Sequence, residues 1–322
     1  MKKLICALVS AALAFSLAGC GVQPALPEGE AVQTAAKTTA VDFWQEKSLL
    51  IYSRSGVELP VPAEYAERVE LEFPEGDGHW RTLFTCWEKA QGGDRARSGE
   101  QVHPGESPGD GWIFSVSRLD QVGFEKWLTE EDGGSYLFAQ DGAGGYYLYT
   151  YPIDTRFQRP ENGMEDAGAW NELNEWGATV PDAILSHNAA LREYDVFSLY
   201  RRDSLYDGAR ATVVYTRGGS AEDPVYFELV QPAKQGEGGV WCVERVEYEY
   251  TADGWTDTHL VFPAGYGIDM TAADYYARLQ TECDAGQHAE LLTPMGAALA
   301  FARAGNAVSS AQEWDFSLLP TL

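Results

Sequence analysis

The sequence predicts an α+β fold in which mainly antiparallel sheets pack against helices, arranged as two small domains. Several short segments alternate polar and apolar side chains, a pattern typical of half-buried strands. Segments with helical spacing follow strands, without the βαβ alternation that indicates a parallel sheet. Hydrophobic residues make up 45% of the 322 residues, which is enough for a sizeable core.

The first domain is expected to span residues 42–195. Its clearest strand covers residues 68–73, where Val69, Leu71 and Phe73 alternate with glutamates. Glycines at 142, 144 and 145, between the expected strands 136–139 and 146–151, predict a hairpin, because glycine adopts positive φ without steric cost. In chain order we expect a short helix at 42–50, strands at 68–73, 82–88 and 112–119, a short helix at 124–128, hairpin strands at 136–139 and 146–151, and helices at 165–176 and 181–192.

The second domain is expected to span residues 196–322, because strand patterns resume there after two helical segments. Thr271 with Asp274 gives an N-cap signal for one helix. Pro294 opens the last helix and Gly305 closes it. We expect strands at 211–216, 225–232, 240–250 and 256–262, then helices starting after Thr271 and Thr293.

The N-terminus has the features of a bacterial lipoprotein signal. Two lysines precede an apolar stretch at residues 4–18, which is shorter than the roughly 20 residues of a membrane span. It ends in LAGC at residues 17–20, which resembles the lipobox of bacterial lipoproteins. The resemblance implies that residues 1–19 are a signal peptide, that diacylglycerol is transferred to the Cys20 sulfur, and that the chain is cleaved between Gly19 and Cys20. Two or more acyl chains anchor a protein stably.

Residues 20–41 are expected to form the lipidated Cys20 and a flexible tether. The segment 21–40 contains no aromatic residue and few large apolar ones, so it cannot offset the entropy lost on ordering. The expected location is therefore the extracytoplasmic face of the cell membrane, where the chain is held by a lipid anchor.

The net charge of the chain excludes one class of binding partner. Lys and Arg number 23 against 49 Asp and Glu, giving a formal net charge of −26. A nucleic-acid binder needs a cationic surface against phosphates, so that class is excluded. The expected partners are the membrane, through the Cys20 anchor, and an envelope protein or glycan.

The cysteines do not form a disulfide framework. Beyond Cys20, the folded region holds Cys86, Cys242 and Cys283, and three thiols cannot all pair within one chain. A Cys242–Cys283 bridge and three buried thiols are the two alternatives, of which buried thiols are favoured. No CxxC motif supports a zinc or redox site.

Catalytic signatures are missing from the sequence. It contains no GxSxG, SxxK, HExxH, Walker A or GxGxxG motif. The acidic run at 130–132 lacks the spacing of a calcium loop, and we interpret it as a solvated turn. The glycine turn at 141–145 is not followed by a helix and has no Lys or Arg nearby in the sequence. We therefore interpret it as a hairpin turn and not as an anion-binding loop. No cofactor or metal is predicted, and an enzyme is not favoured.

The aromatic residues provide the candidate ligand site. Tyr147, Tyr149 and Tyr151 share one face of an expected strand, and Trp170 follows on a helix. An exposed row would stack on sugar rings or on a partner's side chains. A row packed beneath the helix would be core, which is the favoured interpretation.

Two groups of segments resemble exported proteins. GWIFSVSRL at 111–119, YLFAQD at 136–141 and PID at 152–154 resemble segments of uncharacterised extracytoplasmic lipoproteins of anaerobic Gram-positive bacteria. VQPAKQG at 230–236 and GVWCVER at 239–245 resemble modules of exported proteins and envelope sensors of that group. The resemblance implies location and no chemistry.

The sequence therefore predicts a membrane-anchored, non-catalytic lipoprotein with a binding or scaffolding role at the cell envelope. The alternatives are a carbohydrate- or peptidoglycan-binding module that uses exposed aromatic residues, and an envelope hydrolase. Exposed rings beside acidic groups would favour the sugar binder, whereas a cleft with clustered carboxylates or a His–carboxylate pair would favour the hydrolase.

Overall fold

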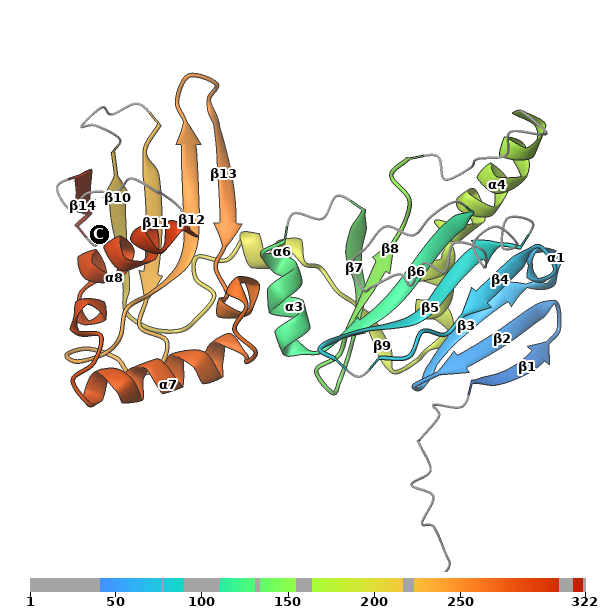
Figure 1. Ribbon diagram of the computed structural model, residues 1–322, viewed down its shortest axis with the longest axis horizontal. Coiled ribbons are helices and arrows are strands. Elements are labelled where there is room, and N and C mark those ends of the chain that lie inside the picture. Colours follow the sequence, from blue (N-terminus) through green and yellow to red (C-terminus); the bar gives the residue numbers. More distant parts are fainter. Residues whose placement is uncertain are drawn as a thin grey trace, which may run out of the picture. The chain divides into compact units, whose positions relative to one another are not determined.

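The computed structural model describes residues 41–76, 78–89, 111–130, 134–154, 164–216, 223–306 and 315–320. Within these ranges the chain has an α+β fold, with three sheets in which neighbouring strands are antiparallel (Figure 1). The predicted fold class is confirmed. The predicted signal peptide at 1–19, Cys20 and nearly all of the 20–41 tether lie outside the described residues.

A three-stranded sheet opens the folded region. It contains β1 (Asp42–Glu46), β2 (Leu49–Arg54) and β3 (Val57–Pro62), in that order. The helix expected at 42–50 is therefore wrong. Lys47 adopts a φ of 55° in the turn between the first two strands, and the Phe43 and Tyr52 rings pack across them in a tilted arrangement, with centroids 5.1 Å apart. Residues 42–46 therefore pair with β2 as a strand and do not form the expected helix.

A six-stranded sheet follows, in the order β4-β5-β6-β8-β7-β9. The strands predicted in this half are confirmed with small shifts of their ends. The sheet consists of β4 (Val69–Glu72), β5 (Trp80–Glu88), β6 (Trp112–Leu119), β7 (Ser135–Asp141), β8 (Tyr146–Thr150) and β9 (Leu191–Glu193). The helices of this part of the chain are α1 (Ala63–Ala66), α3 (Gln121–Leu128), α4 (Met164–Gly177) and α5 (Val180–His187).

The helix expected at 181–192 ends early and is followed by a strand. The buried Asn188 amide donates to the carbonyls of Ile184 and Glu58, and its oxygen accepts the Glu58 N–H at 2.8 Å. These bonds end α5 and tie it to β3, so Leu191 onward can pair with the edge of β7. Helical periodicity alone does not reveal this tertiary contact.

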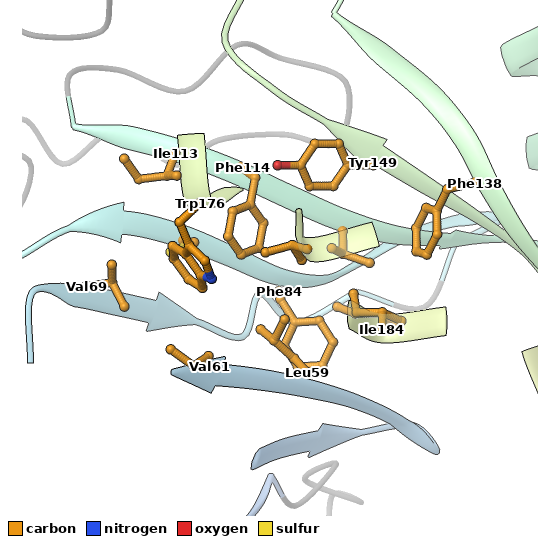
Figure 2. Packing of buried hydrophobic residues seen from close by; sticks show 14 of the residues in the cluster. Leu59, Val61, Val69, Phe84, Ile113, Phe114, Phe138, Tyr149, Trp176 and Ile184 are labelled. Atoms are coloured by element: carbon orange, nitrogen blue, oxygen red, sulfur yellow. The ribbon is translucent and has the colours of Figure 1, made fainter. Parts of the chain in front are cut away.

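The first core lies between the six-stranded sheet, β3 and helices α4 and α5. Leu59 and Val61 of β3 meet Phe84, Phe114 and neighbouring side chains, as Figure 2 shows. Trp176 of α4 packs edge-on to Phe114, with 5.8 Å between ring centroids. Burial of large rings on two sequence-distant elements holds the helices on this sheet.

A five-stranded sheet occupies the C-terminal part, in the order β13-β12-β11-β10-β14. Its strands are β10 (Arg210–Tyr215), β11 (Val225–Val230), β12 (Cys242–Tyr250), β13 (Trp255–Leu260) and β14 (Phe316–Leu318). The four strands predicted here are β10 to β13. The helical segments are α6 (Phe197–Tyr200), η2 (Pro263–Tyr266), α7 (Ala272–Asp284), η3 (Ala289–Leu292), α8 (Pro294–Phe301) and the turn η4 (Ala302–Asn306).

The predicted helix signals of this part are confirmed. The Thr271 hydroxyl accepts the Asp274 N–H at the start of α7, and the Thr293 hydroxyl accepts the Gly296 N–H at the start of α8. Gly305 has a φ of 83° in η4, a left-handed conformation that glycine supplies without steric cost.

A second core is shared by residues on both sides of position 195. It joins Phe124 and Leu128 of α3 to Leu260 and Tyr276. The buried Glu125 carboxylate accepts the Ala272 N–H at 2.7 Å, where it caps the start of α7. The proposed division into domains 42–195 and 196–322 stays a prediction.

Cys86, Cys242 and Cys283 are free, buried thiols. Burial raises the pKa of Cys86 and of Cys242, which disfavours their thiolates. Among the described residues, no helix has the length and apolar character needed to cross a membrane.

Candidate functional site

The aromatic row predicted from the sequence lies mostly in the core. Tyr147, Tyr149 and Trp170 are only 3%, 2% and 2% exposed, whereas Tyr151 is 37% exposed. Side chains this deeply buried have no ring face for a sugar or a partner to stack on. The described structure therefore places three of the four predicted ligand-binding residues in packing roles and leaves Tyr151 at the surface.

The polar atoms of these buried rings have partners within the protein. The Tyr149 hydroxyl donates to the Gly177 carbonyl at 2.6 Å, and the Trp170 Nε1 donates to the Trp112 carbonyl at 3.3 Å. The Tyr147 hydroxyl donates to Asp141 at 3.0 Å. Burying these polar groups without a partner would cost free energy, and the hydrogen bonds avoid that cost. The bonds also fix the orientation of the rings within the core.

In the glycine turn between β7 and β8, the side chain of Asp141 binds the backbone N–H groups of the turn. Asp141 Oδ1 accepts the Ala143 and Gly145 N–H groups at 2.8 and 2.7 Å. Burial alone would raise the pKa of Asp141, but these bonds and the bonds from Tyr147 and Arg118 hold it below its ordinary value. The backbone donors that would cradle an anion are already used.

The acidic run at 130–132 is described only at Glu130, because Glu131 and Asp132 lie outside the described residues. Glu130 forms an i,i+4 ion pair with Lys126 at 3.7 Å. No group of three or more metal-ligating side chains occurs within the described ranges.

A large cavity lies beside the first half of β7. It has a volume of about 860 Å³, within the usual range for sites of small ligands. β9 pairs only with Ala139–Asp141, so the cavity occupies the space beside the preceding residues of β7. We call it the aromatic–acidic cavity; its lining is Trp127, Leu128, Glu130, Ser135, Tyr136, Leu137, Phe138, Pro181, Asp182, Leu185, Glu193, Tyr194, Asp195, Val196, Phe197, Tyr200, Thr256 and Thr258.

Aromatic side chains from four places in the chain reach this cavity. Tyr136, Phe197 and Tyr200 are 40%, 67% and 38% exposed. Trp127 is held by a hydrogen bond from its Nε1 to Ser135 Oγ at 3.0 Å. Tyr194 packs edge-on to Phe124, with ring centroids 5.7 Å apart. Rings held in this way present apolar surface with little further loss of entropy on binding.

Four carboxylates complete the lining. Glu130 pairs with Lys126 and Asp195 pairs with Arg201. The side chains of Asp182 and Glu193 form no ion pair or hydrogen bond with another described residue. The lining residues include no Lys, Arg or His. The cavity is therefore a region of negative potential bordered by aromatic rings.

Asp182 and Tyr136 both line the cavity, and the charge of Asp182 acts on the Tyr136 phenol. Burial is the main cause that raises the pKa of Tyr136, and the charges of Asp182 and Tyr151 add to the increase. Burial also raises the pKa of Tyr194 to about 12. Both tyrosines are thus neutral hydroxyl donors at physiological pH.

Four histidines of the described structure pair with carboxylates: His79, His187, His259 and His288. His259 directly follows the lining residue Thr258 on β13. His79 contacts Asp120 and Asp269, and His259 contacts Asp257. None of these histidines is among the lining residues. The cavity thus combines rings and carboxylates, a chemistry suited to holding a ligand.

The sequence did not reveal the residues of the cavity, because they come from α3, β7, α5, β9, α6 and β13 and from the segments beside them. Each element contributes only one or a few side chains, and no motif joins them. The nearest signal was Tyr136, which was assigned to a hairpin strand; its ring lies 6.1 Å from that of Tyr151.

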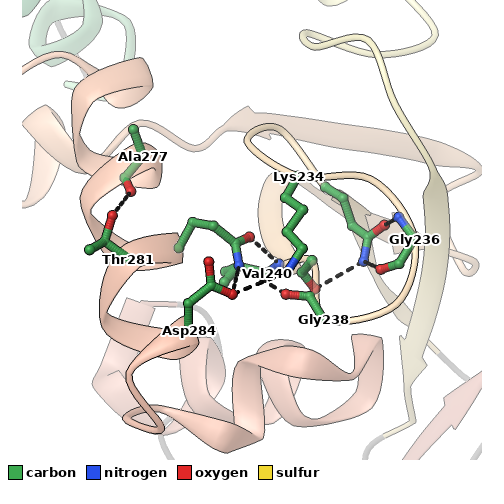
Figure 3. Close-up of polar contacts among 10 residues, drawn as sticks. Lys234, Gly236, Gly238, Val240, Ala277, Thr281 and Asp284 are labelled. Carbon is green, nitrogen blue, oxygen red and sulfur yellow. Dashed lines mark hydrogen bonds and ion pairs between the residues drawn. The ribbon is translucent and has the colours of Figure 1, made fainter.

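The two segments that resemble modules of exported proteins, 230–236 and 239–245, form the end of β11, the loop that follows it and the start of β12. The buried Gln231 side chain donates to the Gly236 and Gly239 carbonyls and accepts the Gly236 N–H. Gln280 of α7 accepts the Val240 N–H, and Lys234 pairs with Asp284 at 3.1 Å (Figure 3). These bonds occupy the polar groups of the loop and fix it against α7.

No protein-family model, curated protein or solved structure matches this chain. A proposal about its function therefore depends on the aromatic–acidic cavity and on the N-terminal sequence.

Proposed function

We propose that this chain is a lipid-anchored binding protein at the extracytoplasmic face of the cell membrane, and that its ligand occupies the aromatic–acidic cavity. The LAGC sequence at 17–20 supports the anchor. The observation that carries the binding role is a cavity of about 860 Å³ in which exposed rings stand beside carboxylates. Concave sites with a few convergent polar groups are the usual form of a ligand site.

A binding role is favoured over catalysis by the chemistry of the lining. It offers no thiol, imidazole or amine among its residues, and the carboxylates lie at exposed positions. Asp182 and Glu193 both line the cavity, and this makes an envelope glycoside hydrolase the second candidate, because that reaction uses a pair of carboxylates. Release of reducing sugar from cell-wall glycan by the purified protein would establish the second candidate instead.

The anchor is tested by metabolic labelling with a fatty-acid analogue. The wild-type chain should incorporate label and be processed, whereas Cys20→Ser should stay an unlabelled precursor because only a thiol accepts the thioether-linked lipid. Cys86→Ser is the matched control and should label like the wild type. Equal labelling of the Cys20→Ser and wild-type chains would contradict the anchor.

The binding role is tested with the mature lipidated protein in detergent micelles. Cationic, neutral and anionic small molecules and soluble cell-wall glycan fragments would be titrated and followed by calorimetry. Phe197→Ala should weaken any saturable binding about fivefold, corresponding to about 1 kcal/mol for a lost ring contact. Phe43→Ala is the control, since Phe43 is an exposed phenylalanine on β1, 57% exposed and outside the lining. Absence of saturable binding in every class would contradict the proposal.

A further inference from the structure

We infer that the ligand of the aromatic–acidic cavity is an organic cation, an amine or quaternary ammonium group carried on an apolar frame. This inference rests on the proposed binding function and names its ligand class. It depends on three features of the described lining: the sign of its charge, the faces of its rings and the kind of its neutral polar groups.

The charge of the lining selects against anions. Four carboxylates and no basic side chain occur among the lining residues. Glu130 and Asp195 have basic partners, Lys126 and Arg201, but Asp182 and Glu193 have none within the described part of the chain. A carboxylate or phosphate ligand would meet uncompensated negative charge, whereas a cation would neutralise it.

The rings supply the second half of a cation site. A cation within about 6 Å of an aromatic face is attracted by the ring quadrupole, most strongly for Trp and Tyr. Trp127, Tyr136 and Tyr200 all line the cavity, and Asp182 lies near enough to Tyr136 to influence its phenol electrostatically. Carboxylate and ring can therefore act on the same bound group.

Exposed rings beside carboxylates also suit a sugar, as expected from the sequence for a carbohydrate binder, but the neutral polar groups of the lining fit a cation better. Sugar hydroxyls are best matched by side chains that both donate and accept, such as Asn and Gln. The lining contains neither, and its hydroxyls besides the tyrosines are Ser135, Thr256 and Thr258. Ser135 already accepts the Trp127 indole N–H. A cation needs only acceptors and ring faces, and the lining provides both.

The volume of the cavity indicates the size of the ligand. About 860 Å³ is much larger than a bare ammonium group requires. Leu128, Leu185 and Val196 add apolar surface to the rings. The ligand should therefore bury an aliphatic or aromatic frame as well as its charge.

The test is a titration of the mature lipidated protein by calorimetry and NMR with four probes. Choline is compared with 3,3-dimethylbutan-1-ol, its uncharged carbon analogue, so that only the charge differs. Benzyltrimethylammonium adds an apolar frame, and chitotetraose represents a neutral glycan. We expect saturable binding of both cations, tighter for benzyltrimethylammonium, and at least tenfold weaker binding of the uncharged analogue.

A change of salt concentration and matched variants test whether cation binding depends on the carboxylates of the cavity. Raising the salt from 0.01 M to 0.3 M should weaken cation binding several-fold, because the carboxylates are exposed and screened. Asp182→Asn combined with Glu193→Gln should weaken it at least fivefold. Glu67→Gln combined with Glu70→Gln makes the same change in net charge at exposed positions outside the lining, and should leave it unchanged.

Three results would overturn the inference: equal affinity for choline and its uncharged analogue, saturable binding of chitotetraose without cation binding, or full binding by the Asp182→Asn, Glu193→Gln variant. Chitotetraose binding that is lost in Phe197→Ala would leave the binding function standing and remove only the cation. Failure of these probes and of the whole wider panel to bind would overturn both. The analogue and salt comparisons use the wild-type chain, so they do not depend on how a variant folds.

Discussion

His79 is a single residue whose two ring nitrogens join distant segments of the chain. Its Nδ1 lies 2.7 Å from Asp120 Oδ2, and its Nε2 lies 2.7 Å from Asp269 Oδ1. The hydrogen bond to Asp120 raises the pKa of His79 above 6.5. Partial desolvation lowers this pKa, but the interaction with Asp269 raises it further. An imidazole that donates from both nitrogens is protonated.

The raised pKa predicts a pH dependence of stability. Protonated His79 stabilises the folded state fully below the unfolded pKa of about 6.5, and this contribution is lost as the pH rises through the higher folded pKa. The free energy of unfolding should therefore fall over that window in the wild type and less in His79→Gln. His259→Gln is the control, because its partner Asp257 is only two residues away. Urea unfolding at pH 5.5, 6.5 and 8 measures the difference, and identical profiles for wild type and His79→Gln would refute the prediction.

At the scale of elements, Asn188 decides where α5 stops and what it touches. Its side chain makes three hydrogen bonds of 2.7–2.8 Å, two of them to the backbone of Glu58 in β3. Asn188→Ala leaves those backbone groups without this partner, which should destabilise the protein by about 3 kcal/mol. Asn171→Ala, at an exposed position of α4, should stay within about 0.5 kcal/mol of the wild type. Denaturant unfolding decides, and a small effect of Asn188→Ala would show that β3 and α5 are held mainly by apolar contacts.

At the scale of the whole molecule, the second core joins residues from both proposed domains. Phe124 and Leu128 pack in the same cluster as Leu260 and Tyr276, and Glu125 caps α7. If the chain divides at residue 195, fragments 42–195 and 196–322 should each melt cooperatively, but at a lower temperature than the intact chain because each loses its share of this cluster. Calorimetry of the two fragments tests this. Cooperative melting of the intact chain alone would mean a single domain.

The sequence by itself determined the α+β class, most strands and the starts of α7 and α8. These depend on local physics: alternation follows from the two-residue period of a strand, and Thr271 and Thr293 cap helices through bonds to residues three positions away. The proposed lipobox LAGC at 17–20 likewise depends on a short stretch of sequence alone, so it can be proposed without a structure.

Only the tertiary structure decided which aromatic residues are core and which line a cavity. Tyr149 and Tyr136 are cross-strand partners in one hairpin, yet Tyr149 is 2% exposed beneath α4, whereas Tyr136 is 40% exposed and lines the cavity with Asp182. Burial depends on what packs against a strand face, and those partners come from elsewhere in the chain. The hairpin at 42–54, the strand β9 and the aromatic–acidic cavity all depend on such long-range contacts, which a local pattern does not encode.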